Sequence, residues 1–409
     1  MASPLCRFCA SPLTETFADL GMSPLSNSYL TPEQGSAMEP FYPLYAWVCS
    51  TCKLVQLQEF ETPDQIFSDY AYFSSYSSSW LAHAERYVAQ MVDTYGIGSD
   101  SQVVEIASND GYLLQYFHER GVPVLGIEPA ANVAEAAIAK GVNTRVAFFG
   151  RETARLVAAE RQADLLLGNN VLAHVPDLND FVAGMKILLA PGGVITMEFP
   201  HLMRLVEDHQ FDTIYHEHFS YLSFMTVSEV FAAHWLQLFD VEEIPTHGGS
   251  LRIHGCHEEA GRERSERVTE LLERERAAGY GELELYRRFA RDLPGEKRQI
   301  VSFLMGLKDE GLSVAAYGAA AKGNTLLNFC GIGTDVFDYV VDLNPHKQDH
   351  LLPGSHIPIR APEALRQTRP DIVVILPWNL RAEITEQHAY VREWGGRFAA
   401  RSPEMRLLD

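Results

Sequence analysis

Apolar runs of strand length alternate with stretches of helical periodicity through most of this chain. Residues 103–106 and 124–127 predict strands, and residues 111–120 between them predict a helix. The same alternation continues with strands predicted at 164–167 and 193–197 and a helix at 179–189. Strands that alternate with helices predict a parallel sheet with crossover connections.

Different patterns flank this unit. Short alternating runs at 42–48 and 54–57 predict a small β-rich module in the first ~60 residues. Residues 258–311 are dominated by Glu and Arg with apolar residues at helical spacing, which predicts a solvated helix or helix pair that only connects two domains. A second strand–helix array then begins, with strands predicted at 313–317, 336–341 and 371–376.

Composition narrows the classes of protein. A chain of 409 residues with 46% apolar residues exceeds one ordinary core, so we expect several domains. The formal charge of −21 disfavours a nucleic-acid partner, because such affinity rests on Lys and Arg. The sequence shows no apolar run of ~20 residues and no leader-like start, so we expect a cytoplasmic protein without a membrane partner. It does not predict the oligomeric state, and a monomer is compatible with it.

Four of the six cysteines form two C-x2-C pairs, Cys6 with Cys9 and Cys49 with Cys52. Each pair can place two thiolates on a tight turn, and two such turns complete a tetrahedral zinc site. Four sulfur ligands leave no open position, so we expect a structural metal that helps to fold the module. Free or redox-active thiols are the alternative, and a zinc ribbon that binds nucleic acid is a rival that the acidic charge disfavours.

The turn after the first strand of the central unit predicts a cofactor site. It contains a single glycine, Gly111, whereas a dinucleotide site needs several. The ammonium group of S-adenosylmethionine needs carboxylates, which Glu105 and Asp110 supply, and its ribose needs an acid, which Glu128 supplies at the next strand end. Acidic helix caps are the alternative interpretation. The other cofactor-binding residues expected are Ala107, Ser108, Tyr112, Leu113, Pro129, Asn169 and Asn170, together with Gly111.

Several motifs together resemble one known family. They are the Cys pairs, the aromatic and serine-rich segment 70–80, Glu-Ile-Ala-Ser-Asn-Asp-Gly at 105–111, Tyr-His-Glu-His-Phe-Ser-Tyr-Leu-Ser at 215–223, His-Gly-Gly-Ser-Leu-Arg at 247–252, Tyr-Gly-Ala-Ala-Ala-Lys-Gly-Asn at 317–324 and Asp-Leu-Asn-Pro-His-Lys-Gln at 342–348. Over nearly its whole length the chain resembles the zinc-containing sugar C-methyltransferases of deoxysugar pathways. That family branches keto-hexoses for antibiotic and polysaccharide sugars.

The resemblance implies methyl transfer to C3, less often C5, of a dTDP-linked 4-keto-6-deoxysugar. It implies an α/β architecture with a zinc module at 1–65, a Rossmann-like methyltransferase domain at 66–245 that begins with a helical segment at 66–98, and a C-terminal Rossmann-like domain at 246–409. The sequence does not distinguish C3 from C5, or a 2-deoxy from a 2-hydroxy sugar.

The chemistry requires a carbon nucleophile beside a ketone, and therefore a base and a partner for the enolate oxygen. The resemblance assigns the base to His218, because an imidazole can be unprotonated near neutral pH. We expect Tyr215 and Glu217 to orient the sugar or the imidazole, and Tyr76 and His174 to donate hydrogen bonds. Histidines among aromatic residues can also be ordinary core residues, and we interpret His216 as structural.

Substrate contacts are expected from both ends of the chain. Lys322 and the backbone at a helix start can receive a diphosphate, whereas Asn324 stands where a phosphate-binding loop that hydrolyses ATP needs lysine. The turn at 247–252 is a substrate-facing loop or a hinge. The expected substrate-binding residues are Tyr72, Gly249, Ser250, Arg252, Lys322 and Asn324. A nicotinamide-dependent sugar-nucleotide oxidoreductase and a zinc scaffold protein without catalysis are the alternative functions.

Overall fold

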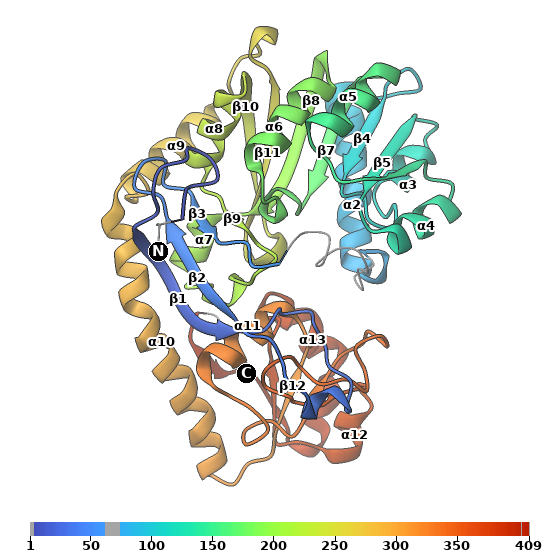
Figure 1. Cartoon of the computed structure of the whole chain (residues 1–409). Coiled ribbons are helices and arrows are strands. Elements are labelled where there is room, and N and C mark those ends of the chain that lie inside the picture. Colours follow the sequence, from blue (N-terminus) through green and yellow to red (C-terminus); the bar gives the residue numbers. More distant parts are fainter. Residues whose placement is uncertain (1–3, 62–73, 402, 409) are drawn as a thin grey trace.

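Three sheets, one in each predicted unit, make up the fold (Figure 1). The computed structural model describes residues 4–61, 74–401 and 403–408. The α/β fold class and the predicted central strands are confirmed, since residues 103–106, 124–128, 163–169 and 189–200 are strands. Among the described residues, none of the helices combines the length and the apolar character needed to cross a lipid bilayer.

The central sheet has seven strands in the order β10-β11-β8-β7-β4-β5-β6. The strands β4 to β8 run parallel, and β11 runs antiparallel between β8 and β10. The strands are β4 (Val103–Ile106), β5 (Val124–Glu128), β6 (Thr144–Val146), β7 (Ala163–Asn169), β8 (Leu189–Pro200), β10 (Leu236–Ile244) and β11 (Ser250–His257). The helices are α2 (Ser78–Tyr95), α3 (Leu114–His118), α4 (Ala131–Ala139), α5 (Arg151–Glu160), α6 (Leu178–Leu188), α7 (Leu202–Glu207) and α8 (Phe224–Ala233).

The segment interpreted from sequence as a turn at 247–252 is a turn only as far as Gly249, and strand β11 begins at Ser250. This strand was not predicted because it contains polar residues that would ordinarily be exposed. Arg252 and His254 are in fact buried. The predicted domain boundary at 245 therefore falls within a hairpin, both strands of which belong to the central sheet.

The N-terminal module is a four-stranded antiparallel sheet of β1 (Glu15–Ser23), β2 (Tyr42–Val48), β3 (Val55–Leu57) and β9 (Ser220–Tyr221). The first three strands come from the predicted β-rich module. The fourth comes from the central unit, where Tyr221 pairs with Val55 and Ser220 with Gln56. The module is thus joined through backbone hydrogen bonds to the segment that follows His218.

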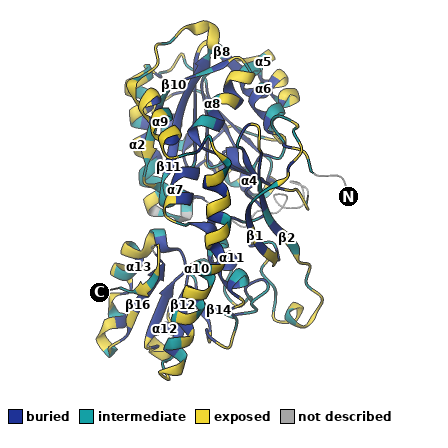
Figure 2. Cartoon of the chain, turned by 90° about the vertical axis from the view of Figure 1, so that its left-hand side faces the viewer, coloured by how far each residue is buried: buried dark blue, intermediate teal, exposed yellow. Residues whose placement is uncertain are grey.

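The region 258–311 is a helix pair, α9 (Glu266–Ala277) and α10 (Leu283–Asp309). The prediction of a plain connector is wrong, because α10 runs along the N-terminal module and the C-terminal domain and buries one face against them (Figures 1 and 2). Its Phe289 stacks on Phe17 of the N-terminal module with ring centroids 4.6 Å apart. Helix α10 therefore packs against both the N-terminal module and the C-terminal domain.

The C-terminal domain contains a six-stranded sheet in the order β14-β13-β12-β15-β16-β17, parallel except for β17. Its elements are β12 (Val314–Tyr317), α11 (Ala321–Cys330), β13 (Val340–Val341), β14 (Ile359–Arg360), α12 (Ala364–Thr368), β15 (Ile372–Ile375), α13 (Arg381–Gln387), β16 (Arg397–Arg401) and β17 (Met405–Leu407). Asp212 of the central unit accepts hydrogen bonds from Trp378 Nε1 (2.7 Å) and Arg401 (3.1 Å). These buried contacts set the position of the C-terminal domain.

Candidate active site

The four predicted zinc ligands come together. The Sγ atoms of Cys6, Cys9, Cys49 and Cys52 all lie within 4.8 Å of one another, with 3.6 Å from Cys6 to Cys52 and 3.5 Å from Cys9 to Cys49. Zn–S bonds of about 2.3 Å in a tetrahedron place sulfurs about 3.8 Å apart, so the cluster fits zinc. Both pairs lie in turns of the same form, in which the carbonyl of the first cysteine accepts the N–H four residues later.

A cavity of about 1100 Å³ lies where the three units meet. It is lined by the carboxyl ends of central strands, by Asn27 of the N-terminal module and by the start of α11 in the C-terminal domain. Ligands of open α/β sheets bind at this edge of the strands. Of the predicted site residues, those lining the cavity are Ala107, Tyr112, Glu128, Pro129, Asn169, Asn170, His174, Tyr215, Glu217, Arg252 and Lys322.

The other predicted cofactor residues lie around this edge without lining the cavity. Ser108 is buried against Gly126, where an added Cβ would collide with its hydroxyl. Asp110 forms an ion pair with Lys140 at 3.0 Å. Gly111 has a φ of +74° and packs closely against Val142 and Ala137, which explains a glycine there. Glu105 and Leu113 are fully buried.

Two features of this edge fit the polar end of S-adenosylmethionine. Asn169 is buried in the cavity wall, and neither polar atom of its amide has a hydrogen-bond partner among the described residues. Burial raises the pKa of Glu105 well above its usual range, the carboxylates of Glu128 and Asp110 add to the rise, and the Tyr112 side chain opposes it. A buried acid in acidic surroundings is a natural partner for a cationic ligand such as an ammonium group.

Glu128 is already held in place. Its Oε2 accepts the N–H of Asn109 and its Oε1 accepts the N–H of Ala130, both at 2.9 Å. Carboxylate oxygens can accept more than one hydrogen bond, so the fixed side chain can still receive ribose hydroxyls.

The Tyr-His-Glu-His motif forms a hydrogen-bonded chain that leads out of the cavity. The Tyr215 hydroxyl lies 2.8 Å from His218 Nε2, and His218 Nδ1 lies 3.3 Å from the carbonyl of Thr213. Because a carbonyl only accepts, Nδ1 carries the proton and Nε2 offers its lone pair to Tyr215. Tyr215 lines the cavity, and His218 lies one hydrogen bond behind it. Burial, with His174 and His247 nearby, holds the pKa of His218 well below its usual range, so its imidazole is neutral.

Two more predicted catalytic residues surround this chain. The His174 ring lies 4.6 Å from that of His218, and burial lowers the pKa of His174 to about 4. Glu217 Oε2 accepts a hydrogen bond from Asn27 Nδ2 at 2.8 Å. Burial raises the pKa of Glu217 to about 7, while Asn27 and Lys347 oppose this rise. The cavity therefore presents a neutral imidazole and a carboxyl group that titrates near neutral pH. His216, interpreted as structural, lies 3.2 Å from the carbonyl of Pro43 through its Nε2.

Two lysines of the C-terminal domain reach the same cavity. Lys322 Nζ donates to Asn379 Oδ1 at 2.7 Å and lies 4.7 Å above the Trp378 ring, and burial lowers its pKa to about 8. Lys347 Nζ donates to the carbonyl of Ala319 at 2.9 Å. Together with the N-terminus of α11 they form a positively charged wall.

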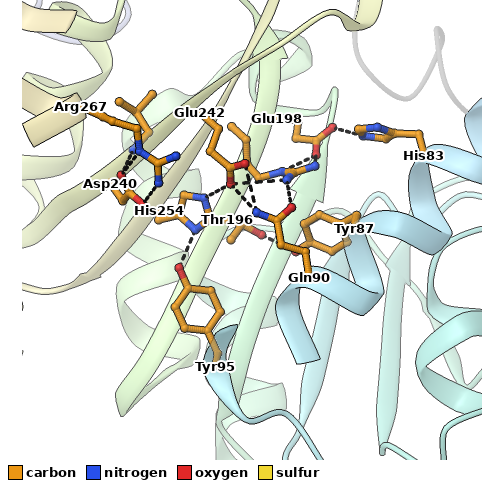
Figure 3. Close-up of polar contacts among 12 residues, drawn as sticks. His83, Tyr87, Gln90, Tyr95, Thr196, Glu198, Asp240, Glu242, His254 and Arg267 are labelled. Atoms are coloured by element: carbon orange, nitrogen blue, oxygen red, sulfur yellow. Dashed lines mark hydrogen bonds and ion pairs between the residues drawn. The ribbon is translucent and has the colours of Figure 1, made fainter. Parts of the chain in front are cut away.

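Arg252 lines the cavity but bonds to Glu198 and Gln90, two residues that Figure 3 labels. Its guanidinium contacts Glu198 at 2.7 Å and Gln90 at 2.8 Å, and Glu198 also bonds His83 at 2.8 Å. Glu242 and His254 extend this network to Tyr95 at the end of α2. The network joins α2 to strands β8, β10 and β11, so this arginine stabilises the cavity wall.

The remaining predicted substrate residues are not brought to the cavity. Ser250 is buried and donates to the carbonyl of Thr246, and Gly249 packs on Arg204. Asn324 is fully buried and does not line the cavity. Tyr72 lies outside the described residues, as does the side chain of Tyr76.

Sequence reasoning missed several lining residues, among them Asn27, Trp80, His83, His247 and Lys347. Lys347 and His247 stand within motifs that carry the family resemblance, and Lys347 follows the carboxyl end of strand β13, a position that favours ligand contact. Asn27 gives no such signal, because only the folded chain brings it next to Glu217.

Comparison with known proteins matches three family models to successive parts of the chain. A zinc binding domain model matches residues 6–67, a methyltransferase domain model matches 80–237, and a C-methyltransferase C-terminal domain model matches 245–403. A solved magnesium protoporphyrin IX methyltransferase from Synechocystis has 12% identity and a TM-score of 0.34, covering 43% of this chain and 79% of that one. An uncharacterized methyltransferase of Mycobacterium leprae is 27% identical over 33% of this chain and 52% of its own length.

The C-methyltransferase NovU of Streptomyces niveus is 36% identical over 405 residues, which is 99% of this chain and 96% of NovU. This full-length match covers the zinc module, the central domain and the C-terminal domain together. The chain therefore belongs to the C-methyltransferase family, as an S-adenosylmethionine-dependent enzyme with a zinc-binding module.

Proposed function

We propose that this enzyme methylates the carbon next to the ketone, C3 in our assignment, of a dTDP-linked 4-keto-6-deoxysugar. The observation that carries the proposal is the shared cavity, in which the cofactor edge, the Tyr215–His218 chain and two lysines of the C-terminal domain face one space. A C-methyltransferase needs a carbon nucleophile, and the hydrogen beside a ketone is acidic enough for a protein base to remove.

Each wall of the cavity has a task in this proposal. Glu128 and Asn169, which line the cavity, hold S-adenosylmethionine, and the carboxyl group of Glu105, buried without lining the cavity, adds to this acidic edge. The cofactor, when bound, supplies a methyl group made electrophilic by a sulfonium charge. Lys322, Lys347 and the start of α11 hold the diphosphate of the sugar nucleotide, because backbone N–H groups and cations favour phosphate. The sugar then extends toward Tyr215.

Tyr215 and His218 remove the proton in our account. The substrate C–H proton passes to the Tyr215 oxygen while the tyrosine proton passes to His218 Nε2, which leaves an enolate and an imidazolium. The Thr213 carbonyl keeps the imidazole in the tautomer that can accept this proton. This refines the sequence hypothesis, since His218 is placed to act through Tyr215.

Product analysis tests the proposed function. The purified enzyme is incubated with S-adenosylmethionine and dTDP-4-keto-6-deoxyglucose or its 2,6-dideoxy relative. Mass spectrometry should show a gain of one methyl group, and NMR should place it on C3. The matched control is the same sugar reduced to the 4-alcohol, which should stay unmodified because it cannot form an enolate. Methylation of both sugars, or of oxygen, would contradict the proposal.

We expect Glu105→Gln to weaken binding of S-adenosylmethionine about tenfold, because it removes negative charge from the edge proposed to meet the ammonium group, and a loss of about 1.4 kcal/mol corresponds to a tenfold change in Kd. Isothermal titration calorimetry measures the Kd directly. Glu160→Gln on the exposed end of α5 is the control and should bind as the parent does. An unchanged Kd for Glu105→Gln would remove this residue from the cofactor site.

The pH profile should report Glu217. Since burial raises its pKa to about 7, kcat/KM should rise through pH 7 as the carboxylate ionises. Glu217→Gln should lower kcat/KM about tenfold and flatten the profile between pH 6 and 8. Asn27→Ala should move the inflection to higher pH, because it removes a hydrogen bond that lowers this pKa. An inflection that persists in Glu217→Gln would belong to another group.

A further inference from the structure

His247 holds a conformation that its residue type disfavours. It has φ 56° and ψ 16°, in the left-handed region, within the hairpin turn between β10 and β11. The two glycines that follow lie against the rings and chains of other elements, Gly248 against Trp378 and Gly249 against Arg204. Strained residues of this kind persist where the surrounding structure fixes them, and they concentrate at functional sites.

The turn is fixed on every side. The Gly248 carbonyl accepts from Gln210 Nε2 at 2.9 Å, and the Gly249 carbonyl accepts the N–H of His201 at 3.1 Å. The imidazole of His247 lies 5.2 Å from the Trp80 ring. Its position relative to the cavity is therefore set before any ligand arrives.

The imidazole borders the cavity and has an unpartnered polar atom. His247 lines the cavity, and its Nε2 is shielded from solvent and has no hydrogen-bond partner among the described residues. Such a buried nitrogen is costly unless a ligand supplies the missing partner. The ring lies near enough to Lys322, His174 and His218, and also to Glu198 and His83, to interact with them electrostatically.

We propose that His247 is a catalytic residue whose Nε2–H donates a hydrogen bond to the ketone oxygen of the sugar and stabilises that oxygen as the enolate forms. This inference rests on the proposed function and adds a residue that the family resemblance did not assign to it. The motif Tyr215–His218 removes the proton, and His247 receives the negative charge that appears on oxygen.

Charge supports this role. Burial, with Lys322 nearby, lowers the pKa of His247 to about 4, so the ring is neutral near pH 7 and has one N–H to donate. A neutral donor beside a lysine creates a local field that favours a negative oxygen. Fixed donors of this kind act strongly because they need no reorganisation during the reaction.

Replacing His247 by glycine separates catalysis from backbone conformation. Glycine is the residue best suited to a left-handed position, so His247→Gly should fold with a melting temperature equal to or above that of the parent. We expect exchange of the substrate hydrogen beside the ketone with deuterium to slow about 10²- to 10³-fold, as for other lost oxyanion donors. The Kd for S-adenosylmethionine, measured by calorimetry, should not change.

Two further variants complete the test. Arg369→Gly, at an exposed left-handed residue that ends α12, should keep the parental exchange rate. His247→Asn keeps a donor and tolerates the left-handed region, so it should recover part of the exchange rate and serves if the glycine variant folds poorly.

Parental exchange in His247→Gly would show that the residue only shapes the turn and would overturn the inference. A weakened Kd for S-adenosylmethionine with unchanged exchange would assign the ring to the cofactor, which also overturns it. An absence of exchange in the parent enzyme would instead refute the proposed function itself, and the inference would fall with it.

Discussion

Replacing His218 by asparagine should lower exchange of the substrate hydrogen beside the ketone by about 10²- to 10⁴-fold, the usual loss when a general base is removed. Asparagine can still donate a hydrogen bond toward the carbonyl of Thr213, so the variant should keep its fold. The measurement is deuterium incorporation into the keto-sugar by mass spectrometry. Binding of S-adenosylmethionine, followed by calorimetry, should survive, since His218 does not line the cavity.

Tyr215→Phe is the informative companion. Because the Tyr215 hydroxyl lies 2.8 Å from His218 Nε2 and stands on the cavity side, removing it should interrupt the proton path and slow exchange by a similar factor. If Tyr215→Phe exchanges within a few-fold of the parent while His218→Asn does not, the imidazole reaches the substrate directly. Parental exchange in His218→Asn would exclude the base that we assign.

Removing zinc should have the largest effect on stability. Structural zinc binds zinc-finger peptides with about 10–16 kcal/mol, and much of that free energy is folding free energy. A loss of even about 4 kcal/mol would lower Tm by roughly 10 °C in a domain of 150 to 250 residues. We therefore expect chelation, or Cys49→Ser, to lower Tm by at least about 10 °C and to abolish methyl transfer.

Activity should fall with stability because the zinc module touches the active site. Strand β3 pairs with β9, two residues after His218, and Asn27 of the module bonds Glu217. The control is Cys330→Ala, a buried cysteine at the end of α11 outside the cluster, which should retain one zinc per chain and the parental activity. A zinc-free enzyme with an unchanged Tm and full activity would contradict a structural role for the metal.

The pattern of apolar residues predicted most of the strands, because buried parallel strands are short runs of Val, Ile and Leu. Residues 103–106 and 163–169 are examples. The apolar pattern did not predict strands that contain buried polar residues. Strand β11 includes Arg252 and His254, whose side chains bond to Glu198 and Glu242, so the sequence resembles a loop although the strand lies inside the sheet. Helix α10 was predicted as a plain connector because it carries many charged residues, although its apolar residues form a face that is buried between domains.

The candidate site, too, could be predicted from the sequence only in part. The zinc ligands could be predicted because two spaced pairs contain the whole geometry. The acidic edge could be predicted because carboxyl ends of parallel strands meet. The contact between Asn27 and Glu217 could not be predicted, since 190 residues of sequence separate the two. The place of His218 behind Tyr215 likewise depends on three-dimensional packing that residue spacing does not specify.

One measurement tests the central claim, a carbanion formed next to the ketone, most directly. The parent enzyme is incubated in deuterium oxide with the keto-sugar and without S-adenosylmethionine, and NMR follows each carbon-bound hydrogen. The account predicts that the enzyme exchanges hydrogen at one carbon beside the ketone, and that the methyl group later appears on that same carbon. A methyl group delivered to a carbon that shows no exchange under any condition, or delivered to oxygen, would contradict it.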